Sequence, residues 1–113
     1  MSDKPVDALP LYKVKLVVRL QAGNTTIGGY TRELDMPCPP CLGMRFTQGI
    51  STRLWETEVG ELDPMVEEII YDIDEETVVC LFTVSKALIS TFWKTLRPNE
   101  VTGRSAELRY FRD

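Results

Sequence analysis

The most regular pattern in the chain is the alternation of apolar and polar positions in residues 11–20. The apolar positions are Tyr12, Val14, Leu16, Val18 and Leu20, and the basic positions between them are Lys13, Lys15 and Arg19. A period of two is typical of a strand with one buried face and one wet face. Residues 22–24 have the composition of a turn, and residues 25–36 are predicted to return as a second strand, with a bulge or bend at Gly28 and Gly29. We therefore predict a β-hairpin with a basic outer face.

A second hairpin is predicted further along the chain. Residues 67–73 mostly alternate between apolar and acidic side chains, and residues 77–84 are apolar or β-branched throughout, which is typical of a central strand. The acidic residues Asp74, Glu75 and Glu76 lie between the two strands and predict an acidic hairpin tip. Further strand candidates are the segments 44–47, 50–59 and 108–111.

One helix is predicted, from Ser85 to about Leu96. Serine is a good N-cap, and Pro98 disfavours helical geometry at the residue before it. Steps of about 100° per residue gather the apolar side chains on one side of this helix and the polar side chains on the other. The apolar set is Leu88, Ile89, Phe92, Trp93 and Leu96, and the polar set is Lys86, Ser90, Lys94 and Arg97. We therefore predict an amphipathic C-terminal helix over residues 85–96.

These elements predict an α+β fold. We expect a bent antiparallel β-sheet, or a partly open β-barrel, of about five to seven strands, with the helix across one face or at one end. The chain of 113 residues fits a single domain over residues 11–113, preceded by a flexible tail at residues 1–10. The predicted core is Val14, Leu16, Val18, Tyr30, Leu34, Ile69, Tyr71, Val79, Leu81, Leu88, Phe92 and Leu96.

Acidic side chains are concentrated in residues 56–76, which hold ten of them and no basic residue. Segment 1–55 has seven basic and four acidic residues and segment 77–113 has six and three, so each is net +3 and the whole chain is −4. Charge runs are usually solvated, but segregated charge also favours association with oppositely charged surfaces. We therefore predict an acidic interaction surface for a basic partner protein, or for a second copy in a homo-oligomer. Its candidate residues are Glu56, Glu58, Glu67, Glu68, Asp72, Asp74, Glu75 and Glu76.

The chain contains no histidine, which removes several classes of catalytic site. A Ser-His or Cys-His nucleophile pair and a histidine metal ligand are both impossible, and no residue spacing indicates another catalytic group. The sequence therefore favours a non-enzymatic protein over an enzyme, and it indicates no cofactor.

Cys38 and Cys41 enclose two prolines and form a candidate thiol site. A Cys-x-x-Cys pair serves as a redox couple or as half of a zinc site in other proteins. Here the prolines favour polyproline II geometry, which places the two Cα atoms roughly 9 Å apart, beyond the limit of about 7 Å for a disulfide. A zinc site built with Cys80 and one carboxylate lacks the usual second Cys-x-x-Cys. We predict reduced, metal-free cysteines packed under a proline-rich crossover, with a redox or metal-handling role as the alternative.

Other partner classes are disfavoured. No nucleic acid is expected, because the pI is near 4.9 and Tyr12 lies on the opposite face from the basic residues of its strand. No apolar run approaches the roughly 20 residues of a membrane span, and the start of the chain lacks a secretion signal, so we expect a cytoplasmic protein with no membrane association. The sequence thus favours a small non-enzymatic interaction module. A small-ligand-binding β-barrel is a further alternative.

Overall fold

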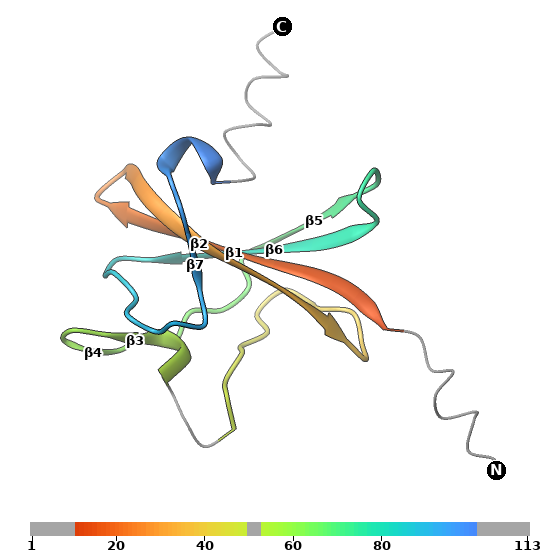
Figure 1. Ribbon diagram of the computed structural model, residues 1–113, viewed down its shortest axis with the longest axis horizontal. Helices are drawn as coiled ribbons and strands as arrows, with labels where there is room; N and C mark the ends of the chain where they lie inside the picture. Colours follow the sequence, from red (N-terminus) through yellow and green to blue (C-terminus); the bar gives the residue numbers. More distant parts are fainter. Residues whose placement is uncertain (1–10, 50–52, 102–113) are drawn as a thin grey trace, which may run out of the picture.

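The computed structural model describes residues 11–49 and 53–101, and a five-stranded sheet forms the centre of that part of the chain (Figure 1). Its strands are β1 (Tyr12–Ala22), β2 (Thr25–Met36), β5 (Glu68–Asp72), β6 (Thr77–Val84) and β7 (Lys94–Leu96), in the order β5-β6-β1-β2-β7. The strands β3 (Glu56–Thr57) and β4 (Gly60–Glu61) form a separate small hairpin. Two short 3₁₀ helices, η1 (Arg53–Trp55) and η2 (Pro98–Glu100), complete the secondary structure of these residues.

Both predicted hairpins are present. β1 and β2 pair antiparallel, and their register shifts between Leu20 and Gln21, which makes Ile27 the extra residue of a β-bulge beside Gly28. β5 and β6 also pair antiparallel, with residues 73–76 at the turn. β6 lies between β5 and β1, so it is an inner strand, as its apolar sequence predicts.

The prediction of an antiparallel sheet or barrel is wrong, because β1 and β6 run parallel. Their pairing extends from Val14 beside Val78 to Leu20 beside Val84. Parallel neighbours need a long connection. The described parts of the crossover, residues 37–49 and 53–67, pack on one face of the sheet before the chain enters β5. Hydrophobic alternation identifies strands and their faces but not their neighbours, so the sequence could not reveal this pair.

The predicted helix over residues 85–96 is also wrong, because this segment is irregular or extended. Lys94–Leu96 form β7, which pairs antiparallel with β2, and Leu88 forms an isolated bridge with β3. The segment is rich in β-branched and aromatic residues of low helix propensity, namely Ile89, Thr91, Phe92, Trp93 and Thr95. The Ser90 hydroxyl also accepts a hydrogen bond from the Phe92 N–H at 3.1 Å, which favours a turn over a helix.

Apolar side chains of this segment still pack in the core. The helical periodicity therefore identified several core side chains correctly but assigned them to the wrong type of secondary structure. The Trp93 indole N–H donates to the Leu54 carbonyl at 2.8 Å, and the Leu88 backbone N–H donates to the Tyr30 hydroxyl at 3.1 Å. The Trp93 ring also lies 5.2 Å from that of Trp55 in η1. These contacts satisfy the buried Trp93 indole N–H and the buried Leu88 N–H without helical hydrogen bonds.

Side chains pack on both faces of the sheet. The larger cluster, on the face covered by the crossover and residues 85–93, comprises Val14, Leu16, Val18, Tyr30, Met36, Leu54, Trp55, Val66, Cys80, Phe82, Val84, Leu88 and Trp93. The smaller cluster, on the other face, comprises Val17, Val79, Leu81 and Val101. The predicted core residues Leu34, Ile69, Phe92 and Leu96 are only half-buried at the margins of these clusters. Tyr71 was the clear error in the predicted core, since it is 57% exposed.

The remaining strand predictions had mixed outcomes. Residues 44–47 are irregular, and the described part of segment 50–59 contains η1 and the short β3 instead of one long strand. The candidate strand 108–111 and the tail 1–10 lie outside the described residues.

We predict that Gly29→Ala destabilises the protein more than Gly28→Ala does. A Cβ atom at Gly29 would lie 2.5 Å from the Val18 carbonyl oxygen and 2.8 Å from the Val101 side chain, whereas one at Gly28 would lie 3.5 Å from its nearest neighbour. The backbone of β1 would have to shift, so Gly29→Ala should cost about 1–3 kcal/mol. Urea denaturation measures both variants, and equal midpoints would contradict the close approach at Gly29.

Candidate functional site

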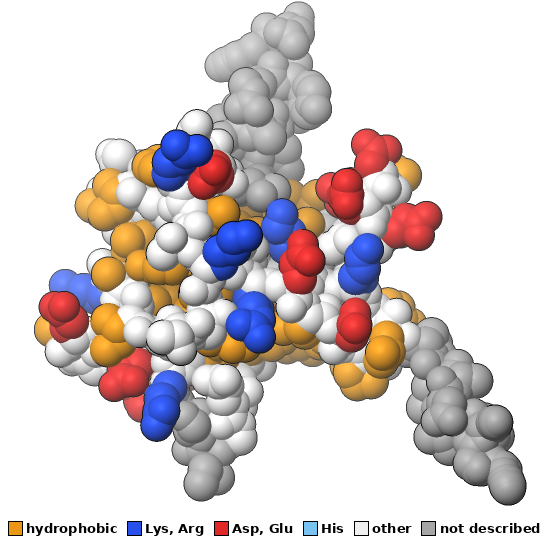
Figure 2. Space-filling view, in the orientation of Figure 1, with side chains coloured by type: hydrophobic (Ala, Val, Ile, Leu, Met, Phe, Trp, Pro, Cys, Tyr) orange, Lys and Arg blue, Asp and Glu red, His pale blue; other side chains and the backbone are white. Residues whose placement is uncertain are grey.

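The structure divides the predicted acidic surface between two hairpins. Glu56 and Glu58 belong to the β3–β4 hairpin. The other six candidates lie at the two ends of β5 and are Glu67, Glu68, Asp72, Asp74, Glu75 and Glu76. The two hairpins lie at opposite corners of the molecule in Figure 1, and Figure 2 shows acidic side chains at both corners. The ten acids therefore do not form one continuous surface, and β5 gathers most of the predicted residues.

Hydrogen bonds fix the backbone of residues 72–77, which we call the acidic turn. The Asp72 carboxylate accepts the Glu75 N–H at 3.2 Å, and the Thr77 hydroxyl donates to the Glu75 carbonyl at 2.9 Å. Glu76 has a φ of 53°, in the left-handed region that glycine or asparagine occupies at lower cost. Since Asp74, Glu75 and Glu76 are all exposed, the turn presents three carboxylates to solvent on a backbone of defined shape.

β5 forms one edge of the sheet. Within residues 11–49 and 53–101, no strand pairs with its outer side, so that side is open to a further strand. Tyr71 in β5 and Ile73 in the acidic turn are 57% and 76% exposed. This edge therefore combines an open backbone, exposed apolar side chains and neighbouring carboxylates.

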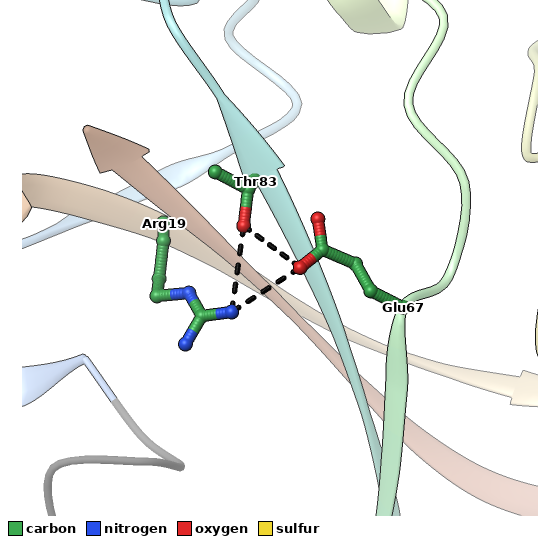
Figure 3. Close-up of polar contacts among 3 residues, drawn as sticks. All are labelled: Arg19, Glu67 and Thr83. Carbon is green, nitrogen blue, oxygen red and sulfur yellow. Dashed lines mark hydrogen bonds and ion pairs between the residues drawn. The ribbon is translucent and has the colours of Figure 1, made fainter. Parts of the chain in front are cut away.

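Glu67, just before β5, has a structural partner in Arg19. Arg19 Nη2 lies 3.3 Å from Glu67 Oε1 and 3.4 Å from Thr83 Oγ1, and the Thr83 hydroxyl donates to Glu67 Oε1 at 3.0 Å (Figure 3). The Arg19 side chain is 13% exposed, whereas that of Glu67 is 42% exposed. The cluster joins β1, β6 and the start of β5. The sequence places Arg19 on a basic face and Glu67 on an acidic surface, but it does not show that the two residues pair.

Cys38 and Cys41 are both free and exposed, so their predicted burial under the crossover is wrong. The Cys41 carbonyl accepts the Met44 N–H at 3.1 Å in a turn where Gly43 has a φ of 83°. In the part of the chain that the structure describes, no three cysteine or acidic side chains gather where they could hold a metal ion. Cys80 lies in the core, and burial raises the pKa of its thiol to about 11.

A groove of about 500 Å³ lies at the other edge of the sheet, where the short β7 covers only part of β2. It is lined by Lys15, Thr31, Arg32, Glu33, Phe92, Trp93, Lys94 and Leu96, and we call it the basic groove. Arg32 Nη1 donates to the Phe92 carbonyl at 2.8 Å, and the guanidinium carbon lies 4.4 Å from the centroid of the Phe92 ring. Sequence patterns do not predict this groove, because the expected helix puts Lys94 on its solvent side and Phe92 in the core.

Comparisons with known proteins identify no relative. No protein-family model, curated protein or solved structure matches the chain. Among the residues described, no helix has the length and apolar character needed to cross a bilayer. A proposal for the function therefore depends on the geometry of the two sheet edges.

We predict that Glu67→Ala lowers the free energy of unfolding by about 1–3 kcal/mol, because it leaves the largely buried Arg19 guanidinium without its carboxylate. Guanidinium denaturation measures the loss, and Glu58→Ala, at an exposed acid of the β3–β4 turn, is the control. The double variant Arg19→Leu with Glu67→Leu should recover part of the loss, since no charge is then left unpaired. A loss for Glu67→Ala no larger than that for Glu58→Ala would show that the cluster adds no stability.

We predict two thiol populations in the folded protein. Cys38 and Cys41 should react within minutes with a chromogenic disulfide reagent at about pH 8, while Cys80 should react only on unfolding, because it is buried and little ionised. Absorbance before and after addition of denaturant counts the thiols in each population. A fast reaction of the folded variant Cys38→Ser with Cys41→Ser would contradict the burial of Cys80.

Proposed function

We propose that the protein is a non-enzymatic interaction module that binds an extended, basic segment of a partner protein along β5. The single observation that carries this proposal is the open outer side of β5 with acidic residues at both of its ends. A strand that joins such an edge gains main-chain hydrogen bonds, while its side chains supply specificity. Basic side chains at the ends of the added strand would meet the carboxylates of β5 and the acidic turn.

The side chains of β5 suit a partner strand that also carries apolar residues. Ile69 packs at the margin of the larger core cluster and Ile70 at the margin of the smaller one, so apolar surface flanks the edge on both faces of the sheet. Tyr71 adds an exposed ring on the same strand. Favourable cross-strand pairs contribute about 0.2–1 kcal/mol each. A short partner strand would therefore gain affinity from apolar side-chain contacts with β5 as well as from attraction to the carboxylates.

A foreign strand fits this edge better than a second copy of β5. In an antiparallel pair centred on Ile70, Glu68 of each copy would lie opposite Asp72 of the other. Like charges directly opposite each other destabilise a strand pair. The acidic edge therefore favours a basic partner over symmetric pairing of β5 with itself.

The backbone of Glu76 also supports a role for the acidic turn. A left-handed conformation costs a non-glycine residue about 1–2 kcal/mol, and such strain is found more often at functional sites. Asparagine would hold the same backbone at lower cost, so the glutamate is not the most stable choice for the turn. The retained strain supports a role for the Glu76 carboxylate in binding.

The exposed thiols of Cys38 and Cys41 indicate the cellular compartment of the protein more than its function. Both are exposed and free, which favours a reducing compartment, and we propose the cytoplasm. A redox or metal-handling role has less support than strand binding, because no neighbouring acid or cysteine group of metal-binding geometry accompanies them in the described residues.

Synthetic peptides provide the test. We predict that a seven-residue peptide of alternating Lys and Val perturbs the amide NMR signals of residues 68–77, and that a Glu-Val peptide binds at least about tenfold more weakly. Replacing Asp74, Glu75 and Glu76 together by their amides should weaken binding by about tenfold with little change in stability. Glu76→Asn alone should weaken binding while it raises the free energy of unfolding by up to about 1 kcal/mol.

Matched controls separate charge, strand pairing and self-association. Glu58→Gln with Glu61→Gln removes two charges from the β3–β4 hairpin and should leave peptide binding unchanged. A Lys-Val peptide that is N-methylated along one edge keeps its charge but cannot pair, so equal binding of this peptide would contradict strand addition. Sedimentation equilibrium without peptide reports self-association, and a dimer abolished by the substitutions in the acidic turn would favour a second copy as the partner.

A further inference from the structure

We propose that the basic groove is a binding site for a phosphate monoester that carries an apolar substituent. This site does not depend on the proposed function of β5, because none of the residues that line the groove belongs to β5 or to the acidic turn. The volume of about 500 Å³ falls within the range of roughly 300–1,000 Å³ that is usual for small-molecule sites.

The charge of the groove fits a phosphate better than a carboxylate. Lys15 from β1, Arg32 from β2 and Lys94 from β7 line it with the single acid Glu33, so three positive charges and one negative charge give a net +2. Across residues 11–49 and 53–101, neither lysine forms an ion pair, although hydrogen bonds from Arg97 and, to a smaller extent, the charge of Lys94 lower the pKa of Glu100. A phosphate monoester carries about 1.5 to 2 negative charges at neutral pH, close to the excess positive charge of the lining.

Arg32 is the pre-positioned member of this set. Its hydrogen bond to the Phe92 carbonyl uses one of its five N–H donors. Its stacking on the Phe92 ring restricts the side chain before any ligand arrives, so less conformational entropy is lost on binding. The planar guanidinium can offer two parallel N–H groups to phosphate oxygens, which an ammonium cannot do.

The groove also provides apolar surface beside its cations. Phe92 and Leu96 are both half-buried in its lining. Arg32 covers one face of the Phe92 ring, so the ring edge and Leu96 are the surfaces left for an apolar substituent. The Thr31 hydroxyl donates to the Leu16 carbonyl at 2.9 Å and is therefore already satisfied. These contacts favour an organic phosphate over the inorganic ion.

A neighbouring hollow determines which end of the groove takes the phosphate. This hollow of about 340 Å³ shares Lys15 and Glu33 with the basic groove and is also lined by Lys13, Asp72 and Glu75, so three carboxylates there face two lysines. The carboxylates at that end repel an anion. The phosphate therefore belongs at the end of the groove where Arg32 and Lys94 lie.

Titration of the full chain with phenyl phosphate, followed by amide NMR signals, tests the site. We expect the changes to concentrate in residues 31–33 and 92–96. Phenyl phosphate should bind about tenfold or more tightly than inorganic phosphate, which lacks the ring, and than benzoate, which carries one charge. Neutral benzyl alcohol should bind more weakly still. Equal affinities for phenyl phosphate and inorganic phosphate would overturn the apolar contact, and changes centred on other residues would overturn the site itself.

Two single substitutions separate the groove from general attraction of anions. Lys94→Gln should weaken phenyl phosphate binding by about tenfold, because it removes one charge-assisted contact while the exposed side chain adds little to folding. Lys86→Gln removes the same charge from an exposed lysine outside the groove and should change the affinity less than twofold. An unchanged affinity for Lys94→Gln, or an equal loss for Lys86→Gln, would refute the proposal.

Discussion

The rest of the structure depends on the burial of both faces of the two central strands. Val17 and Val18 are neighbours in β1 and point to opposite faces, yet both are fully buried, and the same holds for Leu81 and Phe82 in β6. A parallel pair usually requires cover on both sides. The crossover and residues 85–93 cover one face, and Val101 covers part of the other, without any long helix in the described chain.

Sequence patterns predicted the strands more accurately than the segments that cover the two faces of the sheet. Alternation in residues 11–20 and the apolar run in residues 77–84 depend only on which faces are buried, so both strands were recognisable. Val17 shows the limit of this reasoning, because it shares a face with Lys15 and Arg19 in a pattern that indicates solvent exposure. It is buried by the neighbouring strand β6 and by Val101, which are both distant from it in sequence. The helix prediction failed for a related reason: apolar spacing near 100° per residue does not exclude an extended segment that bends to place the same side chains in the core.

The candidate sites were predictable only as far as they are local in sequence. The acidic turn was recognisable, because its carboxylates are consecutive and lie between two strand patterns. The contact between Arg19 and Glu67 was not, since it joins residues 48 positions apart. The basic groove needs three strands in a particular order and a short β7 that leaves β2 partly uncovered. No pattern in a single segment carries that information.

The same burial explains why both proposed sites lie at the edges of the sheet. Side chains at the centre of each face are buried in the core clusters. In the described chain, the edge strands and the ends of the hairpins are therefore the parts that a partner can contact. β5 and β2 are three strand positions apart, or roughly 14 Å at the usual spacing between strands. Asp72 and Glu75 of the acidic turn repel an anion at the end of the basic groove that Lys15 and Glu33 line, because they share a hollow with these two residues. Toward β7 this repulsion weakens, since screening acts over about 8 Å at physiological ionic strength. A chain with a net charge of −4 can therefore bind a cationic strand at one edge and an anion at the other, which an even spread of the same charges would not allow.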